Sequence, residues 1–279
     1  MAEWDSRTVH IAMFDSERKT AMLQTVLTGN VRSMRPVPLA IEAVAPAKKA
    51  CSDCATCCLR HVCLPCELQS TDMTRFGEIA SAKRRILRGA SLYHAGDKFE
   101  SLYAVRSGAF KTVGVSRNGD EKVTGFHLSG ELLGLEAINT GRHSYTAIAL
   151  EDCEVCAIPF AALEKMAGAV PTLQHSLFRV LSGDISRDQG LMQMLGSMTA
   201  EQRLAAFLLT LSRRYERLGY AATRFTLRMT REEIGNYLGL TLETVSRLFS
   251  RFQRDGLLGV QQREIELRNA GALRDMVGY

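Results

Sequence analysis

The sequence predicts an α+β protein in which an antiparallel β-roll is followed by a long helix and a C-terminal winged helix-turn-helix. Three patterns lead to this prediction: short apolar stretches divided by glycine turns between residues 86 and 160, a helical repeat after Pro171, and two capped amphipathic helices within residues 230–253. With 279 residues, the chain is long enough for two compact domains with their own cores.

The composition is that of an ordinary globular protein, with 46% hydrophobic and 23% charged residues. The N-terminus has no apolar core of signal-peptide length, and no stretch reaches the roughly 18 apolar residues of a membrane span. We therefore expect a cytoplasmic protein that has no membrane partner. Residues 199–279 hold thirteen arginines, nine acidic residues and no lysine, so they carry +4 of the net charge of +5. Arginine pairs well with phosphate and guanine, which suits a nucleic-acid partner.

The β-roll is expected over residues 68–165. Stretches such as SLYAVRSGAFKTVGV and KVTGFHL have the length and composition of strands, and glycine turns separate them at regular spacing. Residues 1–50 show no sustained period and are expected to form a weakly ordered extension, and residues 51–67 form a cysteine-rich segment.

A dimerisation helix is expected over residues 166–198. Five apolar residues recur on one stripe at alternating spacings of three and four, as at a helix–helix seam: Phe178, Leu181, Ile185, Met192 and Leu195. A second stripe would pack against the chain's own β-roll, with Leu173, Leu177, Val180, Leu191 and Met194. Two apolar faces on one helix predict a homodimer.

Asp188 lies within the first stripe. In a symmetric parallel pair its carboxylate would meet that of the partner subunit out of water, which is costly unless the charge is relieved. We hypothesise that Asp188, beside Ile185, keeps dimerisation near balance and so makes it switchable.

The winged helix-turn-helix is expected within residues 199–279. Thr230 and Glu233 form a capping-box pattern, Gly239 supplies the turn, and Thr241 can cap the second helix. The segment LLGVQQREIELRN alternates like two short strands around a polar turn, which would be the wing.

The second helix of this motif presents a polar strip suited to bases. Four apolar residues recur at i, i+3, i+4 and i+7 and would be buried: Val245, Leu248, Phe249 and Phe252. Glu243, Ser246 and Arg247 then face outward with Ser250, where they can read base edges in the major groove of double-stranded DNA. Phosphate contacts are expected from Arg231, Arg251 and Arg254.

All eight cysteines lie in two places, six within CSDCATCCLRHVCLPC at residues 51–66 and two in CEVC at residues 153–156. Clustered cysteines outside a secreted context predict metal ligation or redox chemistry. Two CxxC pairs, Cys51-Cys54 and Cys63-Cys66, fit a zinc site of four thiolates, although zinc would leave Cys156 unexplained. No catalytic motif is present, so we do not expect an enzyme.

Over residues 51–275 the chain resembles the fumarate-and-nitrate-reduction regulators (FNR), members of the superfamily that also contains the cyclic-AMP receptor proteins. The motifs that carry the resemblance are SLYAVRSGAFKT, NGDEKVTGFHLSGELLG, the AIPF after Cys156, EQRLAAFLLTLSRRY and ETVSR. The resemblance implies a β-roll like that of cyclic-nucleotide-binding domains, and a palindromic DNA site of the TTGAT and ATCAA kind read by Glu243, Ser246 and Arg247.

The resemblance also implies an oxygen-labile 4Fe-4S cluster. Cys54, Cys57 and Cys63 match the family's ligand spacing and Cys156 its fourth ligand. The family would hold this cluster, and dimerise, under anaerobic conditions. The chain departs from the pattern by its additional cysteines, which leave the ligand choice open: Cys51, Cys58, Cys66 and Cys153. Gly119 and Asp120 resemble a family surface that contacts RNA polymerase, which would favour activation of transcription.

A cyclic-nucleotide receptor is the nearest alternative, because GELLG at residues 130–134 resembles part of a phosphate-binding cassette. That cassette needs an arginine followed by a serine. Here His143 precedes Ser144, and Arg142 is shifted by one residue, which on a strand turns it to the other face.

Overall fold

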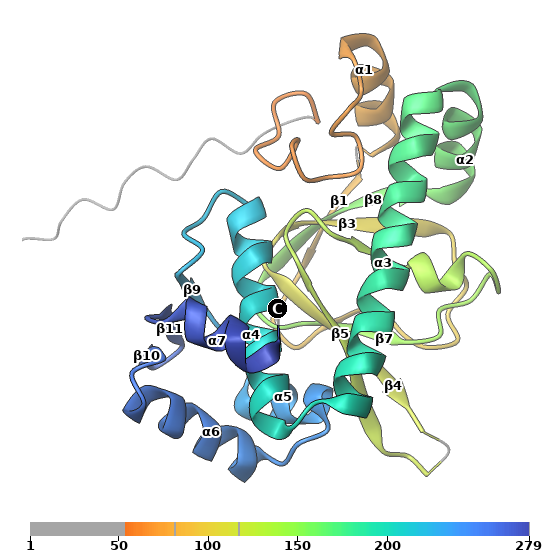
Figure 1. The fold of residues 1–279 in the computed structure, drawn as a ribbon. Helices are drawn as coiled ribbons and strands as arrows, with labels where there is room; N and C mark the ends of the chain where they lie inside the picture. The colour runs from red at the N-terminus through yellow and green to blue at the C-terminus, as the bar shows by residue number, and fades with distance from the viewer. Residues whose placement is uncertain (1–53, 81, 117, 279) are drawn as a thin grey trace, which may run out of the picture. The chain divides into compact units, whose positions relative to one another are not determined.

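The computed structural model describes residues 54–80, 82–116 and 118–278 (Figure 1). The extension expected over residues 1–50, and Cys51, lie outside the described residues.

The β-roll consists of two four-stranded antiparallel sheets, as the glycine-divided apolar stretches predict. The first sheet has the order β1 (Ala82–Ile86), β8 (Cys153–Pro159), β3 (Ser101–Ser107) and β6 (Leu132–Leu133). The second has the order β2 (Ser91–Tyr93), β7 (Thr146–Ala149), β4 (Ala109–Val115) and β5 (Glu121–Leu128). A 3-10 turn, η1 (Leu135–Ala137), follows β6.

Side-chain alternation along β8 separates two cores. Cys153 and Val155 face the interior of the roll, whereas Cys156 and Ile158 contribute to a second core. That second core also contains residues of α1 (Ser70–Ile79) and α2 (Phe160–Ala169). Because side chains three residues apart on a strand point to opposite faces, the two cysteines of CEVC have different surroundings.

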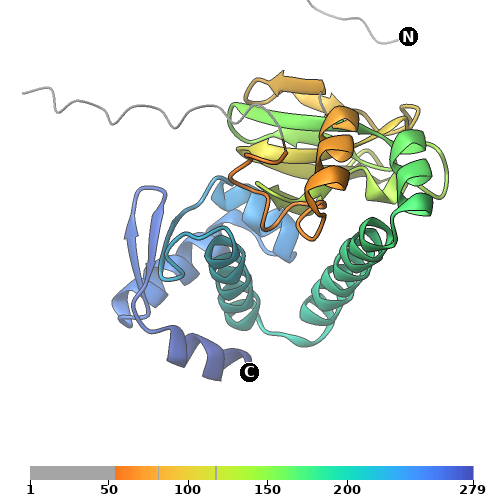
Figure 2. The same cartoon turned by 90° about the horizontal axis from the view of Figure 1, so that it is seen from above.

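The expected long helix is α3 (Pro171–Ser197), which runs beside the β-roll (Figures 1 and 2). It begins at Pro171, where the helical repeat was expected to open, whereas residues 166–169 of the expected segment end α2 and Val170 between the two helices is extended. The physical reason is Pro171, which disfavours the helical conformation of the residue before it.

The two predicted stripes of α3 differ in burial. The second stripe packs on the chain's own cores, from Leu173 to Met194. The first stripe remains open at its centre, because Phe178, Ile185 and Met192 are 58%, 58% and 65% exposed. In this single chain, α3 therefore presents an uncovered apolar row with a seven-residue repeat.

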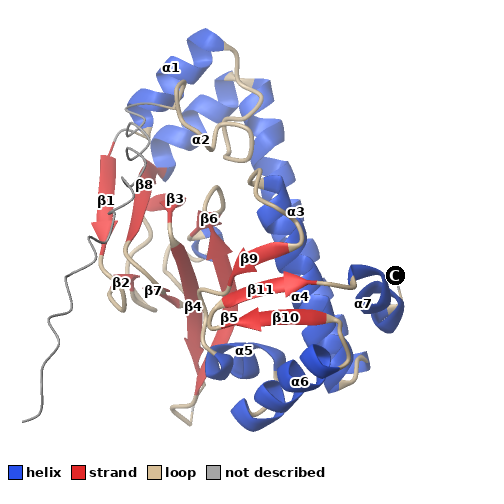
Figure 3. Ribbon diagram, turned by 90° about the vertical axis from the view of Figure 1, so that its left-hand side faces the viewer, coloured by secondary structure: helices blue, strands red, loops and turns tan. Residues whose placement is uncertain are grey.

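The C-terminal part is a winged helix-turn-helix. Its helices are α4 (Ala200–Arg217), α5 (Arg231–Leu238), α6 (Leu242–Arg254) and α7 (Ala270–Val277). The two predicted wing strands are β10 (Leu258–Gln261) and β11 (Glu264–Leu267), and the sequence missed both α7 and a third strand, β9 (Arg224–Thr226) (Figure 3). No helix in the described part of the chain is long and apolar enough to cross a membrane.

Candidate functional site

The helix-turn-helix forms through the local signals that the sequence predicts. At the start of α5, the hydroxyl of Thr230 accepts a hydrogen bond from the backbone N–H of Glu233 at 3.1 Å, and the carboxylate of Glu233 accepts one from the N–H of Thr230 at 2.7 Å. Gly239 ends α5 with a φ of 65°, a conformation that glycine adopts without a steric penalty. Thr241 then caps α6, because its hydroxyl accepts from the N–H of Thr244.

The predicted base-reading residues lie on the exposed face of α6. Glu243, Ser246 and Arg247 are exposed in the N-terminal half of the helix, while its apolar residues are buried against α4 and α5. The Glu243 amide N–H and the Thr241 hydroxyl hold the pKa of the Glu243 carboxyl below its usual range. Glu243 is therefore an ionised acceptor at neutral pH, which suits a cytosine amino group.

Arg231 has a different position from that expected of a phosphate contact. Its guanidinium stacks on the ring of Phe249, 3.2 Å from the ring centroid, and its Nη1 is buried without a hydrogen-bond partner. Burial lowers the pKa of Arg231 to about 10. The side chain thus acts as packing between α5 and α6. Of the other two, Arg254 is largely exposed, and Arg251 pairs with Glu201.

The four predicted cluster ligands line one small cavity. Cys54, Cys57 and Cys63 approach it from the cysteine-rich segment, and Cys156 approaches it from β8. Arg60 and Arg106 line the same cavity. Two buried leucines, Leu64 and Leu68, anchor the segment in the second core.

Burial affects two of the thiols in this cavity, those of Cys63 and Cys156. Burial raises the pKa of Cys63 to about 12, and the nearby Cys54, Cys156 and Cys57 raise it further, while the Leu64 N–H lowers it. Burial also raises the pKa of Cys156, against the opposing effect of Arg106. Four half-buried thiols in one cavity would need a positively charged group to ionise together, and a metal cluster supplies that charge. The donor set thus fits an iron-sulfur cluster. Across the described ranges, however, no group of three or more Cys, His, Asp and Glu side chains is arranged to hold a metal ion.

The remaining cysteines have other surroundings. Cys153 is buried inside the roll, where its thiol donates to the backbone oxygen of Ala109 at 3.3 Å. Cys58 is exposed. The sulfur of Cys66 accepts a hydrogen bond from Arg179 of α3 at 3.5 Å. Among the described cysteines, the cavity therefore selects the set that the spacing indicates.

A contact missed by sequence reasoning joins the cysteine-rich segment to α3. Glu67 accepts from Arg179 at 2.5 Å and from the hydroxyl of the buried Ser176 at 3.4 Å. Nothing in the local sequence indicated this contact, because 109 and 112 residues separate Glu67 from its partners.

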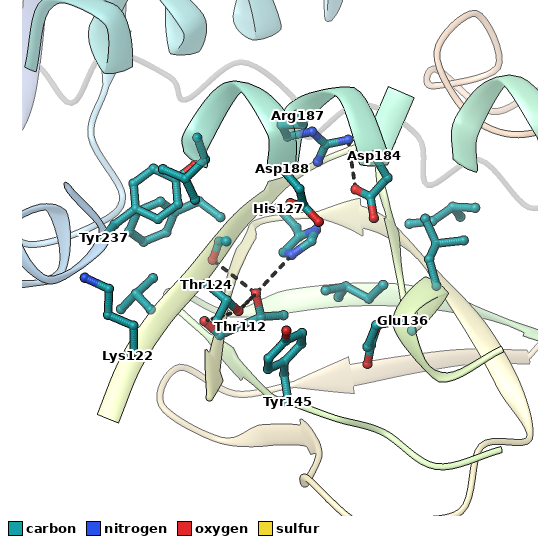
Figure 4. Close-up of a pocket in the computed structure, with 18 of the residues that line it drawn as sticks. Thr112, Lys122, Thr124, His127, Glu136, Tyr145, Asp184, Arg187, Asp188 and Tyr237 are labelled. Carbon is teal, nitrogen blue, oxygen red and sulfur yellow. Dashed lines mark hydrogen bonds and ion pairs between the residues drawn. The ribbon is translucent and has the colours of Figure 1, made fainter. Parts of the chain in front are cut away.

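A larger cavity of about 340 Å³ lies between the β-roll and α3. Asp188 points from α3 toward His127, Asp184 lies beside Arg187, and Thr112, Thr124 and Tyr145 lie opposite (Figure 4). Asp188 is thus at the edge of the uncovered row, on the side nearer the cavity. Asp184, which the sequence did not single out, pairs with Arg187 at 3.3 Å. Burial raises the pKa of Asp184, and the nearby Asp188 raises it further, while Arg187 lowers it.

The arginine and histidine considered for nucleotide binding lie in the loop before β7 rather than on a strand, and Arg142 forms an isolated bridge with Lys98. Arg142 is exposed and donates to the backbone oxygen of Gly96 at 2.8 Å, away from the cavity lining. His143 is buried, stacks on Tyr93 with ring centroids 3.7 Å apart, and lies 3.1 Å from the carboxylate of Glu136. The cavity lining here therefore contains the carboxylate of Glu136, whereas binding of a phosphate would need an arginine.

Gly119 and Asp120 lie at the exposed tip of the β4–β5 hairpin. Gly119 has a φ of 86°, and the N–H of Asp120 donates to the hydroxyl of Ser116 at 3.2 Å. Both residues are exposed, so a partner could reach them.

Comparison with known proteins shows two matching family models and several similar proteins. Residues 83–169 match the cyclic nucleotide-binding domain, and residues 202–276 match the Crp-like helix-turn-helix domain. The transcriptional regulatory protein btr of Bordetella pertussis is 44% identical over 233 residues, which cover 84% of this chain and 96% of that protein. The fumarate and nitrate reduction regulatory protein of Escherichia coli is 43% identical over 226 residues, which cover 81% and 90%. Among solved structures, FixK2 from Bradyrhizobium japonicum matches with a TM-score of 0.64 and 34% identity, covering 70% of this chain and 96% of that one.

Proposed function

Because this chain belongs to the family of fumarate and nitrate reduction regulatory proteins, within the CRP/FNR superfamily of transcription regulators, we propose that it is an oxygen-responsive regulator holding a 4Fe-4S cluster. In this proposal it binds a palindromic DNA site as a homodimer under anaerobic conditions. The DNA-binding helix-turn-helix is a property of the family, and the relatives named above are regulators rather than enzymes.

The convergence of Cys54, Cys57, Cys63 and Cys156 on one cavity is the observation that carries the proposal. When bound, the cluster would supply an oxygen-reactive centre. The four thiols would be its ligands, and Arg60 and Arg106 would offset the negative charge of the thiolates.

Two structural features would connect the state of the cysteine cavity to dimerisation. The contacts of Glu67 with Arg179 and Ser176 hold the cysteine-rich segment against α3. The uncovered row of Phe178, Ile185 and Met192 on α3 would pair with the same row of a second chain. Release of the segment from the cavity would weaken its hold on α3 and disfavour the dimer.

DNA would be read by Glu243, Ser246 and Arg247 on two copies of α6, one at each half-site of a TTGAT and ATCAA palindrome. Activation would use Gly119 and Asp120 as a contact for RNA polymerase. A fall in transcription with Asp120→Ala, at unchanged DNA affinity, would support that contact.

Anaerobic purification with iron and sulfide analysis and a visible spectrum, repeated after exposure to air, tests the proposal. We expect about four irons per chain, lost in air together with DNA binding. The variants Cys54→Ser, Cys57→Ser, Cys63→Ser and Cys156→Ser should each lose iron, whereas Cys58→Ser should retain it. Stoichiometric zinc in place of iron would remove the sensing part of the proposal and leave a zinc-stabilised regulator.

A cyclic-nucleotide-responsive regulator is the second candidate, favoured by the 340 Å³ cavity beside α3. The buried Glu136–His143 pair, with Arg142 outside the cavity lining, opposes it. We expect no heat of binding on titration with cyclic AMP. Tight binding by a chain without iron would establish this alternative.

A further inference from the structure

The DNA-binding part is attached to the free edge of the β-roll. β5 is an edge strand, since its sheet has the order β2-β7-β4-β5. The side chain of Asn236 on α5 completes that edge: its Oδ1 accepts from the N–H of Val123 at 2.7 Å, and its Nδ2 donates to the backbone oxygen of Glu121 at 2.8 Å. One amide side chain therefore pairs with β5 as a neighbouring strand would, and α5 lies at this edge (Figure 3).

Charged contacts reinforce this attachment. Lys111 of β4 lies 2.8 Å from the carboxylate of Glu233, and the two side chains are only 19% and 18% exposed. The Lys122 ammonium donates to the backbone oxygen of Asn236. Because Glu233 also completes the capping box of α5, its carboxylate connects the start of that helix to the β-roll.

The contact between the β-roll and the DNA-binding part is also closely packed. Arg214 of α4 donates to both oxygens of Glu131, at 2.9 and 2.5 Å, and to the backbone oxygen of Phe126 at 2.6 Å. The ring of Phe126 contacts Phe207 of α4 and Tyr237 of α5, with centroids 6.0 and 5.2 Å apart. Residues of the β-roll and of the helix-turn-helix share one hydrophobic core here.

Arg203 fixes the other end of α5 to the dimerisation helix. Its guanidinium donates to three backbone oxygens: to Leu195 at 2.8 Å, to Met198 at 3.0 Å and to Leu238 at 3.2 Å. These oxygens belong to the last turns of α3, the connection to α4, and the end of α5. One side chain therefore spans the only covalent joint about which the DNA-binding part could turn.

We infer that Asn236 and Arg203 are positioning residues that hold the helix-turn-helix at one angle to α3, and so make the dimer selective for the spacing between DNA half-sites. The inference rests on the proposed DNA binding but not on oxygen sensing. If two α3 helices pair, the separation of the two α6 helices depends on the angle between α3 and α5. Adding one base pair rotates a half-site by about a tenth of a turn and moves it by about 3.4 Å. If the angle between α3 and α5 is fixed, the second α6 helix cannot reach the displaced half-site. If the angle can vary, the DNA-binding part can turn to reach it.

A spacing series tests the inference. The DNA affinity of anaerobically purified full-length protein is measured on TTGAT and ATCAA palindromes at the preferred spacing and with one base pair added or removed. We expect the unmodified protein to lose about 100-fold in affinity on the altered sites. In Asn236→Ala and Arg203→Met the loss should shrink below about 10-fold, with an unchanged dimer dissociation constant.

The control is Asn269→Ala, which removes an amide that caps α7 within the same domain and makes no contact with β5. It should keep the full spacing preference. If Asn236→Ala loses DNA affinity equally at every spacing, Asn236 contributes to stability alone and the inference is overturned. The inference is also overturned if the unmodified protein binds every spacing with the same affinity.

Hydrogen exchange provides a second test that needs no DNA. The N–H of Val123 donates to Asn236 rather than to a strand, so its exchange should accelerate at least about tenfold in Asn236→Ala. Lys111→Met should give a smaller acceleration at the same amide. Unchanged exchange at Val123 would contradict the attachment, whatever the iron analysis shows. A chain without iron that keeps these spacing and exchange effects would contradict oxygen sensing only.

Discussion

At the scale of single residues, three side chains each carry a testable property of the structure. Gln262 has a φ of 54°, and it is the only non-glycine residue with positive φ in the described ranges. Arg247 is an exposed cation on a helix that is otherwise buried along one side. His127 is a half-buried imidazole that lines the larger cavity. Each allows a prediction that depends on one side chain.

Gln262→Gly should stabilise the protein. Gln262 lies at the tip of the wing between β10 and β11, where a left-handed backbone costs a side chain about 1 kcal/mol that glycine avoids. We expect the free energy of unfolding, measured in urea, to rise by about that amount. Gln261→Gly, one residue earlier within β10, should lower it. Equal effects of the two substitutions would contradict the strain at Gln262.

Arg247→Ala should weaken DNA binding by about 1–3 kcal/mol and relax the preference at the guanine of TTGAT, as expected for loss of a bidentate base contact. Fluorescence anisotropy on the palindrome, and on one with that base pair replaced, measures both effects. Arg254→Ala, which removes an exposed arginine near the end of α6, should weaken all sequences alike and reduce the salt dependence. A uniform loss in Arg247→Ala as well would assign that residue to the phosphates.

His127 should make stability fall on acidification. Burial lowers the pKa of His127 to about 4, with Glu131 opposing and Arg187 and Arg214 adding to the shift. An unfolded histidine titrates near 6.5, so between about pH 6.5 and 4 the unfolded chain binds more protons. The free energy of unfolding should therefore fall by roughly 1–3 kcal/mol as the pH falls through this window.

The variants His127→Gln and His94→Gln isolate this effect. His127→Gln should flatten the pH dependence between pH 6.5 and 4, whereas His94→Gln, at an exposed position, should leave it unchanged. Parallel pH profiles for the unmodified protein and His127→Gln would assign the acid sensitivity to other groups.

At the scale of elements, α3 has two functions on different sides. Its buried stripe holds it to the chain's own cores, and its uncovered row is available for a second copy. Two aspartates one turn apart separate these functions: Asp184 pairs with Arg187 at the cavity, and Asp188 lies at the edge of the row. A charge at the edge of a dimer seam becomes costly when the dimer forms. Burial also disfavours the charge of Asp184, but that cost is already present in the single chain and does not oppose pairing.

Asp188→Ala should therefore dimerise and bind DNA in air, with a dimer dissociation constant lowered by about tenfold or more, as measured by analytical ultracentrifugation. Asp184→Ala should not, because Asp184 lies away from the row. Ile185→Glu should abolish the dimer both in the otherwise unmodified protein and when combined with Asp188→Ala. It should not unfold the monomer, since Ile185 is exposed. An Asp188→Ala variant that stays monomeric in air would refute the switch role of this residue.

At the scale of the whole molecule, polar contacts connect the cysteine-rich segment to α3 and α3 to the DNA-binding part. Glu67 and Cys66 both contact Arg179 of α3, and Arg203 and Asn236 fix the helix-turn-helix to α3 and β5. Because the DNA-binding part is held against α3 and β5, release of the cysteine-rich segment would affect DNA binding mainly by changing how α3 pairs with α3 of a second chain.

Glu67→Gln should uncouple the cavity from the dimer. Because the Glu67–Arg179 pair is exposed and screened by solvent, the anaerobic dimer dissociation constant should rise only a few-fold while the visible spectrum is unchanged. Asp72→Asn, which removes a comparable pair on α1, should change neither quantity. A spectrum altered by Glu67→Gln would instead place its effect at the cluster.

The sequence by itself determined the parts that local chemistry specifies. Thr230, Gly239 and Thr241 set the ends of α5 and α6 because caps and turns need only nearby residues, and side-chain periodicity distinguished the buried face of α6 from the face with Glu243 and Arg247. Local chemistry also placed the opening of the α3 helical repeat at Pro171, although the outer bound expected for this segment, residue 166, lies within α2.

Only the tertiary structure decided which distant groups meet. Spacing and family resemblance named Cys156 as a ligand, but the placement of its strand beside Cys63 and Arg106 depends on the packing of the whole roll. The same holds for Asn236 on the edge of β5, more than 110 residues away along the chain. Such contacts depend on how completed elements pack, and that packing is a property of the assembled cores rather than of any one segment.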